Sequence, residues 1–129
     1  MHSSYVQAAI DSGFNVFSLS NNHSNDKYLE GIKATISYSE KITTKYAQKE
    51  RKIYFSGLKN GEKDDFSYCI IQKNGWNIVF VAITQLLNRN DYSSYINYVP
   101  SRKENKENFI KWCKKLRSEN PCDLFILSL

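Results

Sequence analysis

Apolar residues recur at helical spacing in three segments of the chain, and this pattern predicts three helices. The first helix is expected over 4–12, and Gly13 after it can adopt the left-handed conformation that ends many helices. The second is expected to begin after Asp26, a candidate N-cap residue, and the pattern does not fix its end within 37–46.

The third helical segment begins with polar residues that are typical of a helix N-terminus. Ser101 and Glu104 have the spacing of a capping box, in which each side chain binds a backbone N–H at the start of a helix. The apolar positions that follow fall on one helical stripe: Phe109, Trp112, Cys113 and Leu116. We therefore expect a helix there with one face packed on a core.

Short apolar runs between the helices indicate strands. The runs lie at 16–20, 52–56, 66–72, 77–84 and 123–129. Asn74-Gly75 separates the third and fourth runs, and this dipeptide is a strong signal for a β-hairpin. The first and last runs are apolar at nearly every position, which predicts burial on both faces. This order of elements predicts an α/β fold, a layered sheet with flanking helices that contains a β-hairpin.

Length and charge place the chain among small globular domains. Its 129 residues are enough for one domain with a core, and no linker or repeat divides them. The net charge, 18 − 13 = +5, comes from dispersed basic residues, which are typical of solvated helix faces, so no nucleic-acid partner is expected. A basic surface is compatible with an anionic polymer or membrane headgroups. No apolar run approaches the about 20 residues of a transmembrane segment.

The three cysteines, Cys69, Cys113 and Cys122, are an odd number and include no CxxC pair. Only His2 and His23 could join them as zinc ligands, so a zinc site is not expected, and His2 near the terminus is expected in solvent. Reduced, mostly buried thiols are the plain interpretation. The chain opens without a signal-peptide pattern, which taken literally indicates the cytoplasm.

A polar motif follows the first apolar run directly. Asn21, Asn22 and His23 come after 16–20 and open into Ser24-Asn25-Asp26. In open α/β sheets, ligands bind at the carboxyl edge of the strands. Asparagine offers a neutral oxygen to a hard metal ion, and histidine offers a proton donor or acceptor near neutral pH. A capped turn would use the same residue types, and the tripeptide by itself favours that simpler interpretation.

The wider context makes the motif more specific. Residues 13–26 read GFNVFSLSNNHSND and closely resemble a signature segment of the CapA family of poly-γ-glutamate capsule biosynthesis proteins. Further similar stretches lie at 30–35, 54–57, 74–82 and 122–129. The resemblance covers nearly the whole chain and implies a fold related to the calcineurin-like metallophosphoesterases.

The resemblance also implies roles for individual residues. In metallophosphoesterase relatives, the second asparagine of the motif binds a metal ion, and the histidine contacts the substrate oxyanion or protonates the leaving group. These roles carry over to Asn22 as a metal ligand and His23 as the catalytic residue, with two divalent ions (Mn, Fe or Zn) in a complete site. Asn21 replaces the glycine of ordinary phosphoesterases, as CapA-like motifs do. Asp26 either orients His23 or caps the next helix, and we favour the cap.

Much of a complete site of this kind is not in the chain. The family's upstream Gly-Asp motif and later histidines are absent, and the family has a histidine at the position after Leu129. We therefore expect 1–129 to be a single, truncated CapA-like domain that is inactive and holds no metal by itself. For the whole protein we expect either a metal-dependent hydrolase or transferase of the CapA type, or a non-catalytic cell-surface polymer assembly or binding protein. The resemblance implies a cell-envelope or extracellular location, with an anionic polymer or envelope assembly components as partners.

Aromatic residues outside the motif have weaker signals. Tyr92, Tyr95 and Tyr98, three residues apart, predict either a patch that faces a sugar or polymer or a partly ordered loop. Trp112 is expected in the core. Trp76 is expected to pack at the hairpin turn or to lie half-exposed at its tip.

Overall fold

The computed structural model describes residues 3–129, so His2 lies outside the described residues. The elements in chain order are α1 (Ser3–Asp11), β1 (Val16–Ser18), α2 (Tyr28–Tyr46), β2 (Tyr54–Ser56), β3 (Tyr68–Lys73), β4 (Trp76–Ala82), the short helix η1 (Ser93–Tyr95), α3 (Lys103–Glu119) and β5 (Leu124–Ser128). Within this described range, each predicted helix and strand is present, with boundaries shifted by a few residues.

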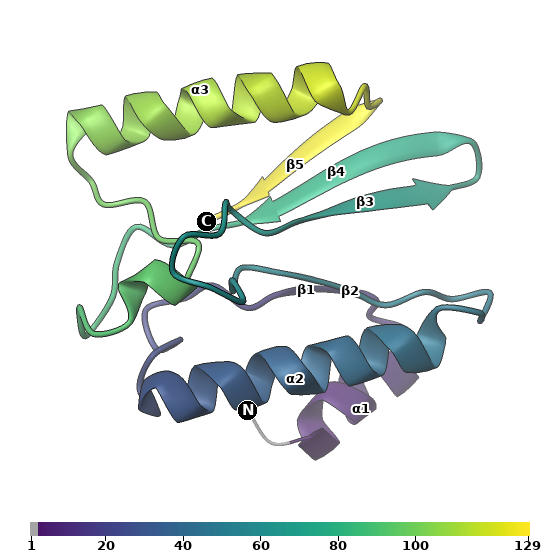
Figure 1. The fold of residues 1–129 in the computed structure, drawn as a ribbon. Helices are drawn as coiled ribbons and strands as arrows, with labels where there is room; N and C mark the ends of the chain where they lie inside the picture. Colours follow the sequence, from purple (N-terminus) through teal and green to yellow (C-terminus); the bar gives the residue numbers. More distant parts are fainter. Residues whose placement is uncertain (1–2) are drawn as a thin grey trace.

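The strands of the described residues form two sheets instead of one. β1 and β2 pair in parallel, with Val16 opposite Tyr54. β3 and β4 form the antiparallel hairpin, and β5 joins β4 in parallel, with Ile126 opposite Phe80. Figure 1 shows four layers, in which α3 covers the three-stranded sheet and α1 and α2 lie beyond the two-stranded sheet. The predicted α/β class is correct, but the single layered sheet is wrong.

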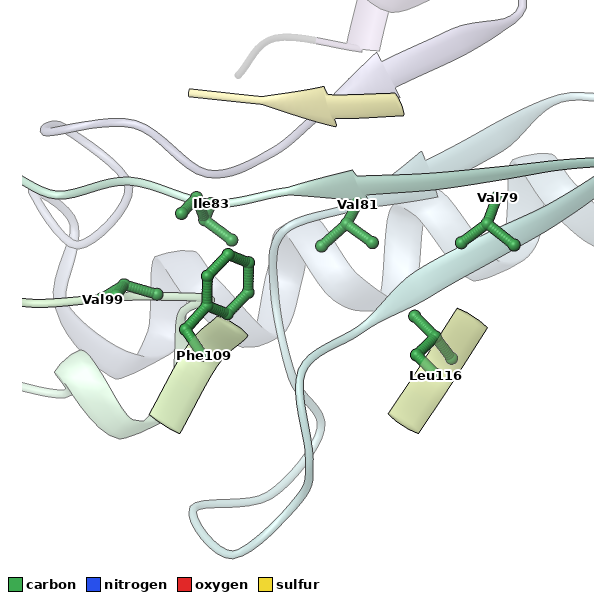
Figure 2. Close-up of a cluster of buried hydrophobic side chains, with 6 residues drawn as sticks. All are labelled: Val79, Val81, Ile83, Val99, Phe109 and Leu116. Atoms are coloured by element: carbon green, nitrogen blue, oxygen red, sulfur yellow. The ribbon is translucent and has the colours of Figure 1, made fainter. Parts of the chain in front are cut away.

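The side chains of β4 explain the two-sheet arrangement, because they are apolar on both faces of the strand. Val79 and Val81 pack against α3 in the buried cluster that Figure 2 shows. Phe80 points to the opposite face and lies in a second cluster, against which Val16 and Tyr54 of the two-stranded sheet pack. Successive strand residues point to opposite faces, so one strand contributes to both cores.

The outer face of the two-stranded sheet is covered by α1 and α2. Val6 and Ile10 of α1 are buried in a cluster against which Phe17 of β1 and Phe55 of β2 pack. The rings of Phe17 and Phe55 stack with their centroids 5.1 Å apart. Gly13, with φ of 106°, ends α1 in a left-handed conformation, as the sequence predicts.

The hairpin prediction is also confirmed. Asn74 and Gly75 both have positive φ, 52° and 81°, as the tight turn between β3 and β4 requires. Trp76 at this tip is half-exposed, whereas Trp112 of α3 is partly buried against the core cluster.

Both predicted N-terminal helix caps are wrong. The residue before α2 is Lys27, which makes no side-chain capping bond, so Asp26 lies one residue too early. The residue before α3 is Arg102, and it makes none either, so Ser101 and Glu104 do not form a capping box. Packing of an amphipathic face supplies most helix stability in proteins, and a helix can therefore begin without its side-chain cap.

The predicted burial on both faces is wrong for β5, whereas β1 packs on both faces through partly buried side chains, Val16 on one and Phe17 on the other. Within residues 3–129, β5 pairs on one side only, and Leu124 and Ile126 are each 44% exposed. Ile126 lines an open groove of about 790 Å³ between the two sheets. β1 also lies at a sheet edge, and its Ser18 is exposed. Composition does not distinguish an edge strand from a central one, because long-range pairing decides that difference.

A polar hub joins the two sheets near the ends of their strands, and it centres on the fully buried Asn97. The Asn97 amide nitrogen donates to the carbonyls of Ser67 and Ala82, each at 2.8 Å. Its amide oxygen accepts the Ser67 N–H at 2.9 Å. The Asn97 backbone N–H donates to Gly57, and its carbonyl accepts the Ser20 hydroxyl. The hub therefore fixes the segments that leave β1, β2 and β4.

Gly57 brings the end of β2 against the segment that leads from β1 into the polar motif. Its φ is 127°, and a Cβ built there would lie 2.4 Å from the Ser20 nitrogen. Next to it, the Leu19 N–H donates to the Ser56 carbonyl at 2.7 Å. Only glycine fits this close approach without strain.

Candidate functional site

The motif loop between β1 and α2 is held by its own side chains. The Ser24 hydroxyl accepts the Asn21 N–H at 2.8 Å and donates to the Leu19 carbonyl at 2.9 Å. The Asn21 side-chain oxygen accepts the His23 N–H at 2.9 Å. Asn21 therefore shapes the loop that presents Asn22 and His23.

His23 is oriented by Asp26. Its Nδ1 lies 2.7 Å from Oδ2 of Asp26, and the two side chains are 62% and 44% exposed. Because a carboxylate only accepts hydrogen bonds, Nδ1 carries the proton, and Nε2 is the unprotonated nitrogen of the neutral ring. The sequence left two roles open for Asp26; the structure shows the contact with His23 and places Lys27, not Asp26, at the N-cap of α2.

Asn88, on the segment after β4, is a site residue that sequence reasoning missed. Its side-chain oxygen accepts the Asn22 amide N–H at 3.1 Å, and its backbone N–H donates to the Asn22 carbonyl at 3.0 Å. Its amide nitrogen lies 3.1 Å from Nδ1 and 3.5 Å from Nε2 of His23. The sequence of 85–100 contains no signal that this segment folds back onto the motif. Asn22, His23, Asp26 and Asn88 are called the motif cluster below.

Asn25, a second missed residue, anchors the segment that carries Asn88. It is fully buried, and its amide nitrogen donates to the carbonyls of Arg89 and Asp91, each at 2.7 Å. Its Oδ1 is buried with no hydrogen-bond partner among the described residues. Arg89 adds a second connection, because its guanidinium binds the Tyr28 hydroxyl and the Asp91 carboxylate. These two hydrogen bonds raise the pKa of Arg89.

The motif opens to two neighbouring hollows. Asn22 and Leu129 line a hollow of about 300 Å³ together with Gln85. The carboxyl end of β5 and the loop after β1 therefore border one hollow, although the two strands belong to different sheets. His23 lines a second hollow of about 230 Å³ with Lys27.

The three tyrosines of the 92–98 loop do not form a common outward patch. Tyr95 and Tyr98 pack against a buried cluster that includes Ile32 and Ile96. Tyr92 is exposed, with a positive φ of 58° just before η1. The patch interpretation is therefore wrong, and the loop has an ordered path over the core.

Two atoms of the motif cluster are of the kind that bind divalent ions. Its available donors are Oδ1 of Asn22 and Nε2 of His23, and an amide oxygen suits a hard divalent ion. In residues 3–129, no group of three His, Cys, Asp or Glu side chains lies together as a ligand set. The donors thus fit a divalent ion only as contributors to a larger set.

The cysteines of the described chain are free and partly buried. The Cys69 thiol donates to the Phe55 carbonyl at 2.9 Å and so connects the two sheets. Burial raises the pKa of Cys69 to about 11. Burial also raises the pKa of Cys113. High pKa values keep thiols protonated and unreactive near neutral pH, which fits structural roles.

Comparison with known families now bears on this arrangement. The family model described as bacterial capsule synthesis protein PGA_cap matches residues 1–129. The chain belongs to this family. Membership confirms the resemblance to capsule biosynthesis proteins, and it associates this capsule synthesis protein with the cell envelope. No curated protein and no solved structure matches the chain. No helix in residues 3–129 is both long and apolar enough to cross a membrane.

Proposed function

We propose that this capsule synthesis protein contributes its motif cluster to a metal-dependent hydrolase or transferase centre with a metallophosphoesterase-type fold. In this proposal the capsule polymer is poly-γ-glutamate. In this centre Asn22 binds a divalent ion through Oδ1, and His23 contacts the substrate without binding the metal. The observation that carries the proposal is the 2.7 Å contact between Asp26 and His23 Nδ1 beside Asn22, because it leaves Nε2 as the ring nitrogen that Asp26 does not bind.

The chemistry of His23 follows from that contact. With Nδ1 bound to Asp26, the protonated ring can donate its Nε2–H to a leaving group or to a developing oxyanion. A bound divalent ion would polarise the oxygen of the bond that reacts. Asn22, held by Asn88, would keep its Oδ1 in one position for that ion.

Residues 1–129 are expected to have no phosphoesterase activity when purified alone. In the described part of the chain, the His, Cys, Asp and Glu side chains form no cluster of three. The assay uses a generic phosphomonoester and phosphodiester with added Mn²⁺. Turnover that disappears in Asn22→Ala would contradict this expectation.

The roles of Asn22 and His23 can be separated in a protein that includes the flanking gene sequence. Asn22→Ala should lower metal content, because it removes an oxygen ligand. His23→Ala should retain the metal and lower turnover by about 10²–10³-fold, the cost of losing a contact made in the transition state. Asn90→Ala, at an exposed position in the Asn88 segment, is the matched control. Equal metal loss in the Asn22 and His23 variants would contradict the assigned roles.

A non-catalytic assembly or polymer-binding role is the second candidate, and the net charge of +5 favours it. Poly-γ-glutamate is a polyanion, so its binding to a basic protein would weaken steeply with salt. Unchanged metal in both Asn22→Ala and His23→Ala, with salt-dependent binding of poly-γ-glutamate, would favour this role over catalysis.

A further inference from the structure

We infer that Asn88 is a positioning residue that holds Asn22 and His23 in a single arrangement. The inference rests on the proposed function only in that it assigns those two residues to the site. The Asn88 side chain contacts both of them, and it comes from the segment after β4, whereas they lie after β1. One side chain therefore links the two segments through the functional groups themselves.

The oxygen of the Asn88 amide contacts Asn22, and the nitrogen contacts the ring of His23. The Asn88 oxygen accepts the Asn22 amide N–H at 3.1 Å, which leaves Oδ1 of Asn22 as the atom available to a ligand. Without this partner the Asn22 amide could rotate and present either its oxygen or its nitrogen. The Asn88 amide nitrogen lies along the edge of the His23 ring, 3.1 Å from Nδ1 and 3.5 Å from Nε2. The amide nitrogen therefore contacts the same edge of the ring that carries the contact with Asp26.

The backbone of this segment is fixed independently of the Asn88 side chain. The Asn88 N–H donates to the Asn22 carbonyl at 3.0 Å, and any substituted residue other than proline keeps this bond. Asn25 binds the carbonyls of Arg89 and Asp91 just beyond it. A side-chain substitution at Asn88 should therefore change the motif cluster without displacing the segment, and the exposed position predicts little effect on stability.

Nuclear magnetic resonance of the full chain tests the inference, because the sequence has only His2 and His23 to assign. Histidine labelled in the ring and asparagine labelled in the side chain report on His23 and Asn22. In Asn88→Leu, both the Asn22 amide signals and the His23 ring signals should shift. In Asn88→Asp, a carboxylate oxygen still accepts from Asn22, so its amide signals should stay near those of the native protein while the ring signals shift.

Asn90→Ala is the matched control and should leave both sets of signals in place. The melting temperature of each variant should stay within about 2 °C of the native protein, as for an exposed substitution. Unchanged Asn22 and His23 signals in Asn88→Leu would overturn the inference, as would equal shifts in Asn90→Ala. These signals come from the free protein, so they decide the role of Asn88 independently of whether Asn22 binds a metal.

Discussion

Two groups of polar residues in this protein use the same side-chain chemistry in opposite ways. In the polar hub, Asn97 is fully buried, and its side-chain amide makes three hydrogen bonds of 2.8–2.9 Å to backbone groups of Ser67 and Ala82. In the motif cluster, Asn22 and His23 are partly or largely exposed, and each has a polar atom that is not used by the fold. The hub uses asparagine for structure, whereas the cluster leaves donors and acceptors free for a ligand.

This difference in burial predicts that the polar hub determines stability, whereas the motif cluster determines binding or catalysis. A buried polar group must be satisfied, and losing its partner costs about 1–3 kcal/mol for each group left unpaired. An exposed group loses little, because water replaces the partner. Substitutions in the hub should therefore affect folding, and substitutions in the motif cluster should affect the site alone.

The largest effect is expected for Asn97→Leu, which has a similar volume and no hydrogen-bonding atoms. It would remove the acceptor of the part-buried Ser67 N–H and the side-chain donor of the buried Ala82 carbonyl, whereas the Ser67 carbonyl would keep the Ser56 hydroxyl. The free energy of unfolding, measured in urea, should fall by about 3–5 kcal/mol. Asn90→Leu serves as the exposed control, with a change within about 0.5 kcal/mol. If Asn97→Leu lowered the free energy of unfolding by less than about 1 kcal/mol, the polar hub would be no more important for stability than the exposed motif cluster.

Gly57→Ala should have the next largest effect. The φ of 127° is unfavourable for alanine, and the new Cβ would meet the Ser20 nitrogen at 2.4 Å. We expect the free energy of unfolding to fall by at least about 2 kcal/mol, from backbone strain and displacement of the β1 end. Gly75→Ala tests strain without a clash, because no atom lies within 4 Å of its Cβ position. An equal loss in both variants would show that the close approach at Ser20 contributes nothing.

Asn25→Ala should have an intermediate effect, because Asn25 is buried like the hub but supports the motif cluster. The change leaves the Arg89 and Asp91 carbonyls without their amide donor and also removes the buried, unpartnered Oδ1. The expected loss is about 1–3 kcal/mol in the free energy of unfolding. The Asn88 and His23 resonances should broaden or shift in the same variant. Full stability with an unchanged motif cluster would contradict the anchoring role.

His23→Ala and Asp26→Asn should have the smallest effect on stability. Both side chains are largely exposed, and exposed ion pairs contribute little to folding. Urea unfolding should give changes within about 0.5 kcal/mol of the native protein. A loss above about 1 kcal/mol would place the motif cluster with the hub as a structural element.

Local patterns in the sequence were enough for much of the fold. The hairpin turn depends only on two adjacent residues, Asn74 and Gly75, that tolerate positive φ, and the structure has that turn. The helical stripe of α3 likewise follows from residues near one another in the chain. The helix caps at Asp26 and Ser101 failed because a cap depends on where the preceding chain enters the helix, and tertiary packing sets that path.

The sequence by itself determined the kinds of elements, their order, and the motif at Asn22 and His23, because these depend on side chains close together in the chain. Only the tertiary structure decided that the strands form two sheets and that β5 lies at an edge. It also decided that Asn88 joins a motif 66 residues away. Contacts at such separations depend on how the layers pack, and apolar periodicity does not specify which loops then meet.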